Sequence, residues 1–210
     1  MTEPDPLILV IDSVSAACSA ALIGPDGACV AERHEVVGRG HAERLVPMIA
    51  DLLGGRVPAS ILVDCGPGSF TGLRVGLAAA HGLAIGWNVP LAGYSAAALL
   101  AAMADANGGP VAAALLGGHG EIFVQSFAGE PLEPLDALRS LRPEDAAGQI
   151  GAQVIVGSGA AALVAARGHG EVVDLLPRAA AAWRLPLPLR SLPPRPIYGR
   201  APDARPMTAA

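Results

Sequence analysis

A glycine-rich turn at residues 63–76, VDCGPGSFTGLRVG, is the stretch best suited to chemistry, because such turns often bind phosphate. Bare backbone N–H groups and the positive end of the following helix would face the anion. The glycines are spaced G-x-G-x-x-x-G, one residue longer than the dinucleotide-binding fingerprint, and residues 83–96 contain no acid for a ribose. A P-loop needs a lysine, which the chain lacks, and a nucleophile elbow needs glycines where Pro67 and Thr71 stand. The turn therefore matches none of these catalytic motifs.

Asp12 and a second glycine turn are the remaining weak candidates for a nucleotide site. Asp12 ends an apolar stretch at 7–13, where its carboxylate would either approach a metal–phosphate group or cap a turn. Both interpretations stay open. Gly157 and Gly159 form a G-x-G turn between an apolar and a helix-like stretch. The five histidines include no pair spaced i,i+3 or i,i+4, so no helical metal site is expected.

The charged residues narrow the function classes further. The chain carries 14 basic and 19 acidic residues, a formal charge of −5, and every basic residue is Arg. Without lysine, Schiff-base catalysis is excluded. An acidic chain is also a poor stand-alone binder of nucleic acid, because phosphate neutralisation supplies most non-specific affinity. If the chain works on RNA, a partner should carry most of the contact.

The cysteines and the N-terminus indicate a cytoplasmic protein. Cys18, Cys29 and Cys65 are odd in number and show no C-x-x-C spacing, which favours a reduced compartment. The N-terminus is acidic, and its apolar run is too short for a signal sequence. No run reaches the roughly 18 apolar residues that span a bilayer, so no membrane association is expected.

Apolar periodicity predicts an α/β chain of two lobes, at 1–106 and 107–210, joined at NGGP (107–110). The strands expected in the first lobe are 7–13, 17–24, 28–37 and 60–65, and the helices are 41–53, 71–87 and 95–106. The second lobe should contain strands at 111–116, 121–127 and 153–159, a helix from about Pro143, a helix at 160–168 and an extended proline-rich tail at 184–206. ILVDCGPGSFTGL and VIVGSGAAALV both read as strand, glycine turn and helix, which indicates a degenerate internal repeat.

Glycines recur at contact spacing within the helix expected at 71–87. Gly72 and Gly76 are four residues apart, and so are Gly82 and Gly86. Each costs about 1 kcal/mol relative to alanine inside a helix, so four of them need a reason. Small residues at this spacing allow a second helix to approach closely. A close-packed soluble helix pair is one interpretation, and an ordinary core helix in a glycine-rich chain is the other.

Five stretches together resemble the TsaB (YeaZ) family, a bacterial subunit of the machinery that makes threonylcarbamoyladenosine on tRNA. They are LILVIDSVSAACSAALIGPDG, HAERLVPMI, GPGSFTGLRVGLAAAHGLA, VIVGSGA and PIYGRAPDA. The resemblance covers nearly the whole chain and is strongest over 7–94. It implies the two-lobed actin-like, sugar-kinase-like ATPase (ASKHA) fold, in which each lobe is built on a βββαβα core, with the second lobe degenerate.

The resemblance also implies a non-catalytic subunit that pairs with the transferase TsaD and is joined by the ATPase TsaE. TsaD carries the metal-binding histidines and the nucleotide site, so ATP or ADP and metal are expected on the partner subunits and tRNA is reached only through the complex. The family pairs through first-lobe helices, which correspond here to 41–53 and 71–87. We therefore expect a heterodimer, or a homodimer through the same helices when the chain is alone. The expected interface residues are His41, Leu45, Met48, Leu52, Gly72, Gly76, Leu77, Ala80 and Leu83.

Two places depart from the family pattern. Leu116-Gly117-Gly118 stands where the family usually reads Asp-Ala-Arg, and Tyr198-Gly199-Arg200 stands where it usually reads Tyr-Leu-Arg. These changes put in doubt any role carried by the second lobe, but not the first-lobe pairing.

An alternative from another class is a small-molecule kinase or ATPase that acts in the cleft between the lobes. It would use Asp12 and the Gly157–Gly159 turn. The missing lysine does not exclude it, because actin-like ATPases can rely on acidic groups and a metal. Binding of Mg–ATP by the isolated chain would separate the two functions.

Overall fold

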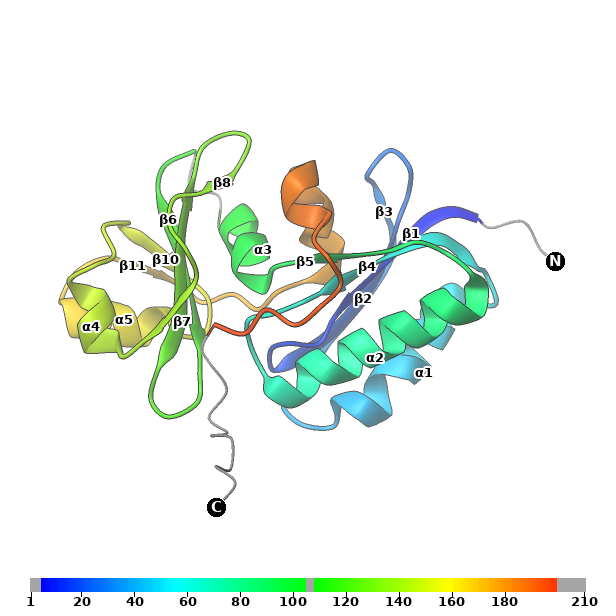
Figure 1. Ribbon diagram of the computed structural model, residues 1–210, viewed down its shortest axis with the longest axis horizontal. Helices are drawn as coiled ribbons and strands as arrows, with labels where there is room; N and C mark the ends of the chain where they lie inside the picture. The colour runs from blue at the N-terminus through cyan, green and yellow to red at the C-terminus, as the bar shows by residue number, and fades with distance from the viewer. Residues whose placement is uncertain (1–4, 105–107, 200–210) are drawn as a thin grey trace, which may run out of the picture.

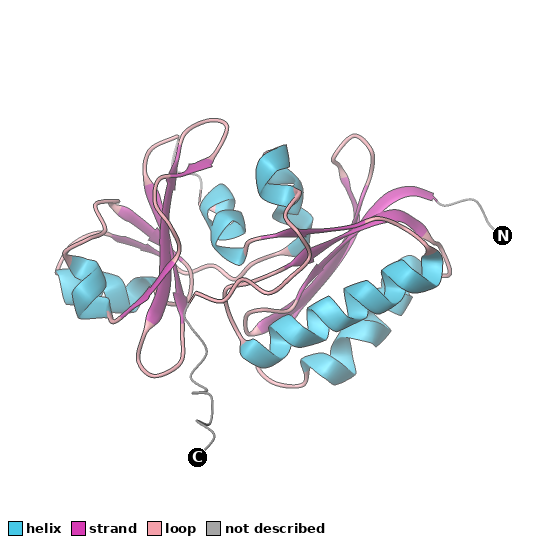
Figure 2. Ribbon diagram, in the orientation of Figure 1, coloured by secondary structure: helices cyan, strands magenta, loops and turns pink. Residues whose placement is uncertain are grey.

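A computed structural model of the chain describes residues 5–104 and 108–199, which form two mixed sheets with helices packed on them (Figures 1 and 2). The predicted lobe boundary at 106, the first residue of the predicted joint at 107–110, and the tail beyond 199 lie outside the described residues. The α/β class is confirmed by the two sheets.

The first sheet has the order β3-β2-β1-β4-β5. Its strands are β1 (Asp5–Asp12), β2 (Ala17–Ile23), β3 (Cys29–Val36), β4 (Pro58–Asp64) and β5 (Leu91–Tyr94). β1 is antiparallel to β2 and parallel to β4, which is in turn parallel to β5. Because parallel neighbours need a crossover connection, a helix follows β4, namely α2 (Phe70–Trp87). It lies beside α1 (His41–Leu53) on one face of the sheet (Figure 1).

The second sheet repeats this arrangement with shorter elements, in the order β11-β10-β6-β7-β8. Its strands are β6 (Val111–Leu116), β7 (Ile122–Ala128), β8 (Glu133–Pro134), β9 (Arg139–Leu141), β10 (Val154–Val156) and β11 (Glu171–Val173), and its helices are α4 (Pro143–Ala147) and α5 (Ala160–Arg167). β6 is antiparallel to β7 and parallel to β10, as β1 is to β2 and β4. In the first sheet, β4 is followed by the glycine turn at 66–69 (the GPGS turn) and by α2. In the second sheet, β10, the Gly157–Gly159 turn and α5 stand in the same order and place. The topology confirms the predicted repeat.

Helix α3 (Ala96–Met103) lies between the two sheets and joins their cores (Figure 1). Its buried alanines and leucines pack with residues of both halves, such as Leu99 with the cluster that contains Val111 and Phe127. The C-terminal segment then returns to the first sheet through two 3-10 helices, η1 (Ala179–Arg184) and η2 (Leu187–Arg190). Ala179 N donates to Ser19 Oγ at 3.0 Å, which fixes η1 on β2.

Residues 191–199, called the strap from here on, run from β5 back toward the second sheet. Leu192 forms an isolated bridge with Gly93, and Ile197 N donates to Cys65 O at 2.7 Å. The tail predicted to be extended at 184–206 is thus partly helical, since it contains η2, and Leu185 near its start is buried. The strands β5, β8, β9 and β11 are four residues long or shorter, and the sequence pattern did not predict them.

Candidate protein-docking surface

The GPGS turn positions α2 against the loop between β1 and β2. Ser69 caps the helix by accepting from Gly72 N at 3.2 Å, and its own N–H donates to Val14 O at 2.6 Å. A Cβ at Gly68 would lie 2.2 Å from Val14 O, so only glycine allows this approach. The N–H groups of Ser69 and Gly72 thus donate within the chain, and the turn packs α2 against the β1–β2 loop.

The glycine stripe of α2 divides into an inward and an outward pair. A Cβ at Gly72 would lie 1.9 Å from Ser13 O, and one at Gly76 would lie 2.5 Å from Ser13 Oγ. A Cβ added at Gly82 or Gly86 would have no other atom within 4 Å. The inward pair therefore brings α2 onto the end of β1, whereas the outward pair has no reason within the described chain to be glycine.

The residues predicted to form the interface mostly lie in the core of the protein. The buried ones are His41, Leu45, Met48, Leu52, Gly72, Gly76, Leu77 and Ala80, and Leu83 is half-buried. The helical spacing identified the apolar stripe of each helix correctly, but the chain's own sheet already covers that stripe. His41, for example, has its Nε2 2.9 Å from Ser15 O. Eight of the nine residues are therefore buried within this chain, and their part in an interface stays a prediction.

The outward face of α1 and α2 carries apolar side chains exposed to solvent. Val46 is 54% exposed and Ile85 is 80% exposed, the highest fraction among the large apolar side chains of the described chain. Ala50, Ala78, Gly82 and Gly86 are also exposed on these two helices. We call Val46, Ala50, Ala78, Gly82, Ile85 and Gly86 the docking face. A sequence signal did exist, since Val46 and Ile85 are large apolar residues placed off the core stripe.

Asp12 lies beside Asp64 in a fully buried acidic pair rather than in an open cleft. The two residues end the adjacent strands β1 and β4, and both carboxyl groups are buried. Gly66 N donates to Asp64 Oδ1 at 2.7 Å, and Tyr94 Oη donates to Asp12 Oδ2 at 3.1 Å. Burial raises the pKa of both carboxyl groups, most strongly that of Asp64, whose pKa the neighbouring Asp12 raises further.

The Gly157–Gly159 turn packs against β6. A Cβ at Gly157 would lie 2.7 Å from Ala114 O, and Gly159 N donates to the same oxygen at 2.9 Å. Both glycines therefore serve the contact between two strands of the second sheet. Asp12 and the Gly157–Gly159 turn are thus both packed within their own sheets.

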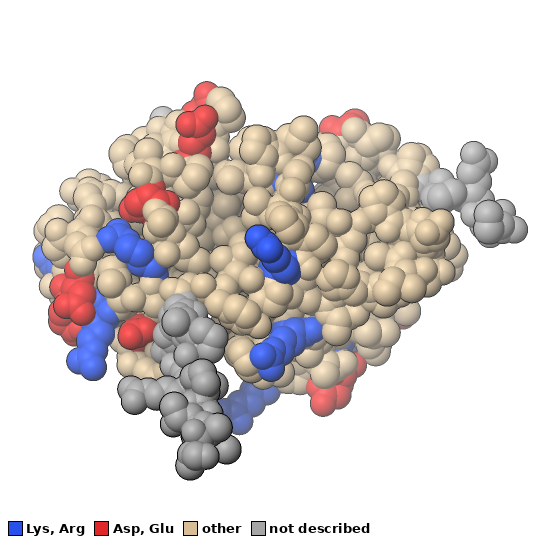
Figure 3. All heavy atoms as spheres, viewed as in Figure 1, with Lys and Arg blue, Asp and Glu red and all other residues tan. Residues whose placement is uncertain are grey.

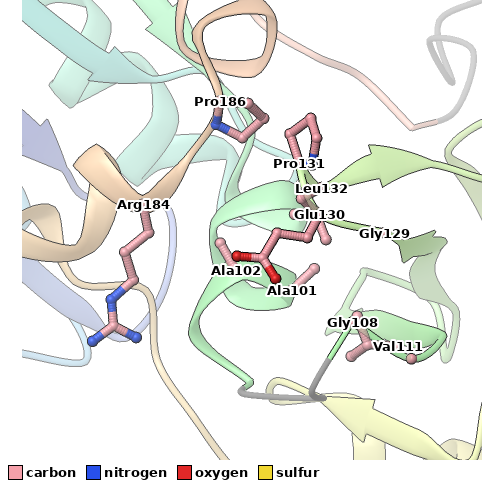
Figure 4. A pocket seen from close by; sticks show the side chains of 11 residues that line it. Ala101, Ala102, Gly108, Val111, Gly129, Glu130, Pro131, Leu132, Arg184 and Pro186 are labelled. Carbon is pink, nitrogen blue, oxygen red and sulfur yellow. The ribbon is translucent and has the colours of Figure 1, made fainter.

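A cavity of about 660 Å³ opens between the lobes, beside the end of α3. It is lined by Ala101, Ala102, Gly108, Gly109, Val111, Gly129, Glu130, Pro131, Leu132, Arg184 and Pro186. The Glu130 carboxylate lies over Ala101 and Ala102, while the Arg184 side chain is directed away from it (Figure 4). Across the described residues, no group of three or more His, Cys, Asp or Glu side chains could hold a metal ion, and no helix is long and apolar enough to cross a membrane.

Comparison with known proteins supports the family that the sequence resembles. The family model described as TsaD, tRNA N6-adenosine threonylcarbamoyltransferase, matches residues 33–136. The tRNA threonylcarbamoyladenosine biosynthesis protein TsaB of Escherichia coli is 38% identical over 125 residues, covering 55% of this chain and 52% of that protein. A solved structure of YeaZ from Pseudomonas aeruginosa superposes with a TM-score of 0.77 at 26% identity, covering 92% of this chain and 100% of that one. These findings support assignment of the chain to the TsaB (YeaZ) family. The chain spans about half the length of the curated relatives it matches.

Two departures from the TsaB family pattern meet at one aromatic ring. A Cβ at Gly199 would lie 2.4 Å from Phe123 Cδ1, and one at Gly117 would lie 3.4 Å from Phe123 Cε2. Gly199 therefore makes room for the Phe123 side chain, whereas a Cβ at Gly117 would first meet Glu121 O, at 3.0 Å. The departures at 117 and 199 are explained by packing.

We expect Gly199→Leu to destabilise the protein and Phe123→Ala to reduce that effect. The new side chain would collide with the ring, and such overpacking costs about 1–3 kcal/mol. Urea unfolding of the two single variants and the double variant measures the coupling between them. Strictly additive effects would contradict this account of the glycine.

Proposed function

We propose that the chain is a non-catalytic subunit that pairs with the TsaD transferase, joined by the TsaE ATPase, in the threonylcarbamoyladenosine modification of tRNA. Assignment to the TsaB family and the name of the Escherichia coli relative support the pathway. The observation that carries the pairing is the docking face, where Ile85 is exposed between open glycines.

The open glycines are the specific argument for a protein partner. Gly82 and Gly86 each cost about 1 kcal/mol inside α2, and no neighbour within the described chain requires them. Without side chains at these positions, a partner helix can approach the backbone of α2 closely while Ile85 and Val46 fill its grooves. A buried apolar side chain of this kind at the centre of an interface is a typical source of binding energy.

The proposal places no cofactor on this chain and leaves ATP or ADP and metal to the partner subunits. It is supported by the burial of Asp12 and by the packing of Gly157 and Gly159 against Ala114. Mg–ATP titrated calorimetrically into the isolated chain should give no binding at micromolar concentrations. Micromolar binding would favour the kinase alternative.

Ile85→Asp should weaken pairing with TsaD at least tenfold, because it places a charge in the centre of an apolar contact. Light scattering should show a one-to-one complex for the natural chain, and calorimetry gives the affinity of each variant. Leu135→Asp is the matched control, since Leu135 is 60% exposed but lies in the second lobe. Absence of any complex with the natural chain, or equal weakening by both variants, would refute the proposal.

The same face predicts self-association when the partner is absent. A second copy would bury the docking face in an isologous contact. Sedimentation of the isolated chain should therefore show a dimer that Ile85→Asp converts to a monomer, while Leu135→Asp leaves it unchanged.

A further inference from the structure

The strap and the start of α2 together form an exposed aromatic and basic cluster beside the docking face. The rings of Phe70 and Tyr198 lie 6.4 Å apart, and the Arg74 guanidinium stacks 3.6 Å from the centre of the Phe70 ring. Phe70 is 56% and Tyr198 53% exposed. We call Phe70, Arg74, Arg195 and Tyr198 the stacking cluster.

The strap is held along α2, so the cluster is a built surface. His81 Nε2 lies 3.0 Å from Pro194 O at one end, and the Phe70–Tyr198 contact marks the other. Phe70, Arg74 and His81 are spaced by four and seven residues, which places them on one side of the helix. Arg195 is exposed between the two contact points.

The two segments that contribute to this surface lack acidic residues although the chain is acidic overall. Residues 65–104 and 175–199 contain no Asp or Glu, but they contain Arg74, Arg178, Arg184, Arg190 and Arg195. Among the described residues, Arg44, Arg139 and Arg178 form ion pairs, while neither Arg74 nor Arg195 has an acidic partner. In the middle of the face shown in Figure 3, over the strap and the start of α2, basic side chains stand without acidic neighbours.

We infer that the stacking cluster contacts single-stranded RNA, in the form of the loop nucleotides of the tRNA substrate; this inference rests on the proposed function. Aromatic faces and guanidinium planes stack unpaired bases, and an unpaired Arg neutralises phosphate. A protein contact is less suited to this surface, because the neighbouring docking face already supplies the apolar area and lacks these charges. The partner supplies most of the affinity, and this chain adds stacking and a local positive charge.

The test measures RNA affinity of the complex with TsaD, using an unmodified, fluorescein-labelled anticodon stem–loop RNA. Tyr198→Leu keeps an apolar contact to Phe70 but removes the π face, and it should weaken binding about fivefold or more. Tyr198→Phe should bind like the natural chain. Arg195→Ala should lower the slope of log affinity against log salt by about 0.7. Arg142→Ala, an exposed arginine of the second lobe, should change neither quantity.

Light scattering on the same samples separates this inference from the proposed function. Formation of the complex should be unchanged in Tyr198→Leu and Arg195→Ala, because both residues lie outside the docking face. If these variants instead weaken the complex at unchanged RNA affinity, the cluster is a protein contact and the inference is overturned. Unchanged affinity and salt slope in both variants overturn it equally. If the natural chain forms no complex, the proposed function fails, and the same variant ranking is then measured on the isolated chain at low salt.

Discussion

Gly72→Ala should destabilise the protein by about 2 kcal/mol or more, whereas Gly82→Ala, ten residues later in α2, should stabilise it by up to about 1 kcal/mol. A Cβ at Gly72 would lie 1.9 Å from Ser13 O, a backbone atom at the end of β1 that cannot move without shifting the sheet. Gly82 has open space, so alanine only gains helix propensity there. Urea unfolding of the two variants measures both free energies of unfolding.

Gly76→Ala tests whether the cause is the backbone collision. Its Cβ would meet Ser13 Oγ at 2.5 Å, the end of a side chain that donates to Gly72 O at 2.8 Å. That hydroxyl can rotate away at the cost of one buried hydrogen bond, so the effect should lie between those of Gly72→Ala and Gly82→Ala. A Gly72→Ala variant as stable as the natural chain would show that α2 does not approach β1 as described.

The fold could be predicted from the sequence wherever the elements were long and their apolar pattern periodic. α1 and α2 show 3.6-residue spacing, and the main strands are apolar runs, so their positions and the internal repeat followed. β5 and β11 could not be predicted, because four or fewer residues carry no period and become strands only by pairing with β4 and β10. The 3-10 helix η2 could not be predicted either, because the prolines around it are typical of an extended segment.

The sequence predicts interface residues on the buried side of α1 and α2, whereas the docking face proposed from the structure is on their exposed side. Periodicity identifies the stripe that is buried, and it does not say whether the sheet or a partner buries it. Leu45 and Leu77 therefore looked like interface residues, although the chain's own core covers them. The open and filled glycines of α2 were also indistinguishable in sequence, because the difference between Gly72 and Gly82 depends on the position of Ser13, fifty-nine residues before Gly72.

Asp64→Asn should stabilise the protein at neutral pH, and the gain should grow as pH rises. Burial and the neighbouring carboxyl group raise the folded-state pKa of Asp64 well above its usual 3.8, and burial also raises that of Asp12. Above pH 3.8 the folded state therefore holds a proton that the unfolded state has lost. Stability falls as pH rises toward the folded-state pKa, by up to about 1.4 kcal/mol per pH unit for each such proton. An amide at position 64 can donate to Asp12 without titrating, so the variant loses part of this slope.

The decisive quantity is the difference in free energy of unfolding between Asp64→Asn and the natural chain, measured in urea from pH 5 to pH 8. Taking the difference removes the titration of groups that both proteins share. Asp51→Asn, which makes the same change on the exposed surface of α1, should leave the pH slope of the natural chain unchanged. The buried Tyr94 lies beside Asp12 and Asp64. Its hydroxyl donates to Asp12 and stabilises the charged form of that carboxylate. A difference that is flat with pH would mean that burial beside Asp12 does not raise the folded-state pKa of Asp64, and it would contradict the prediction.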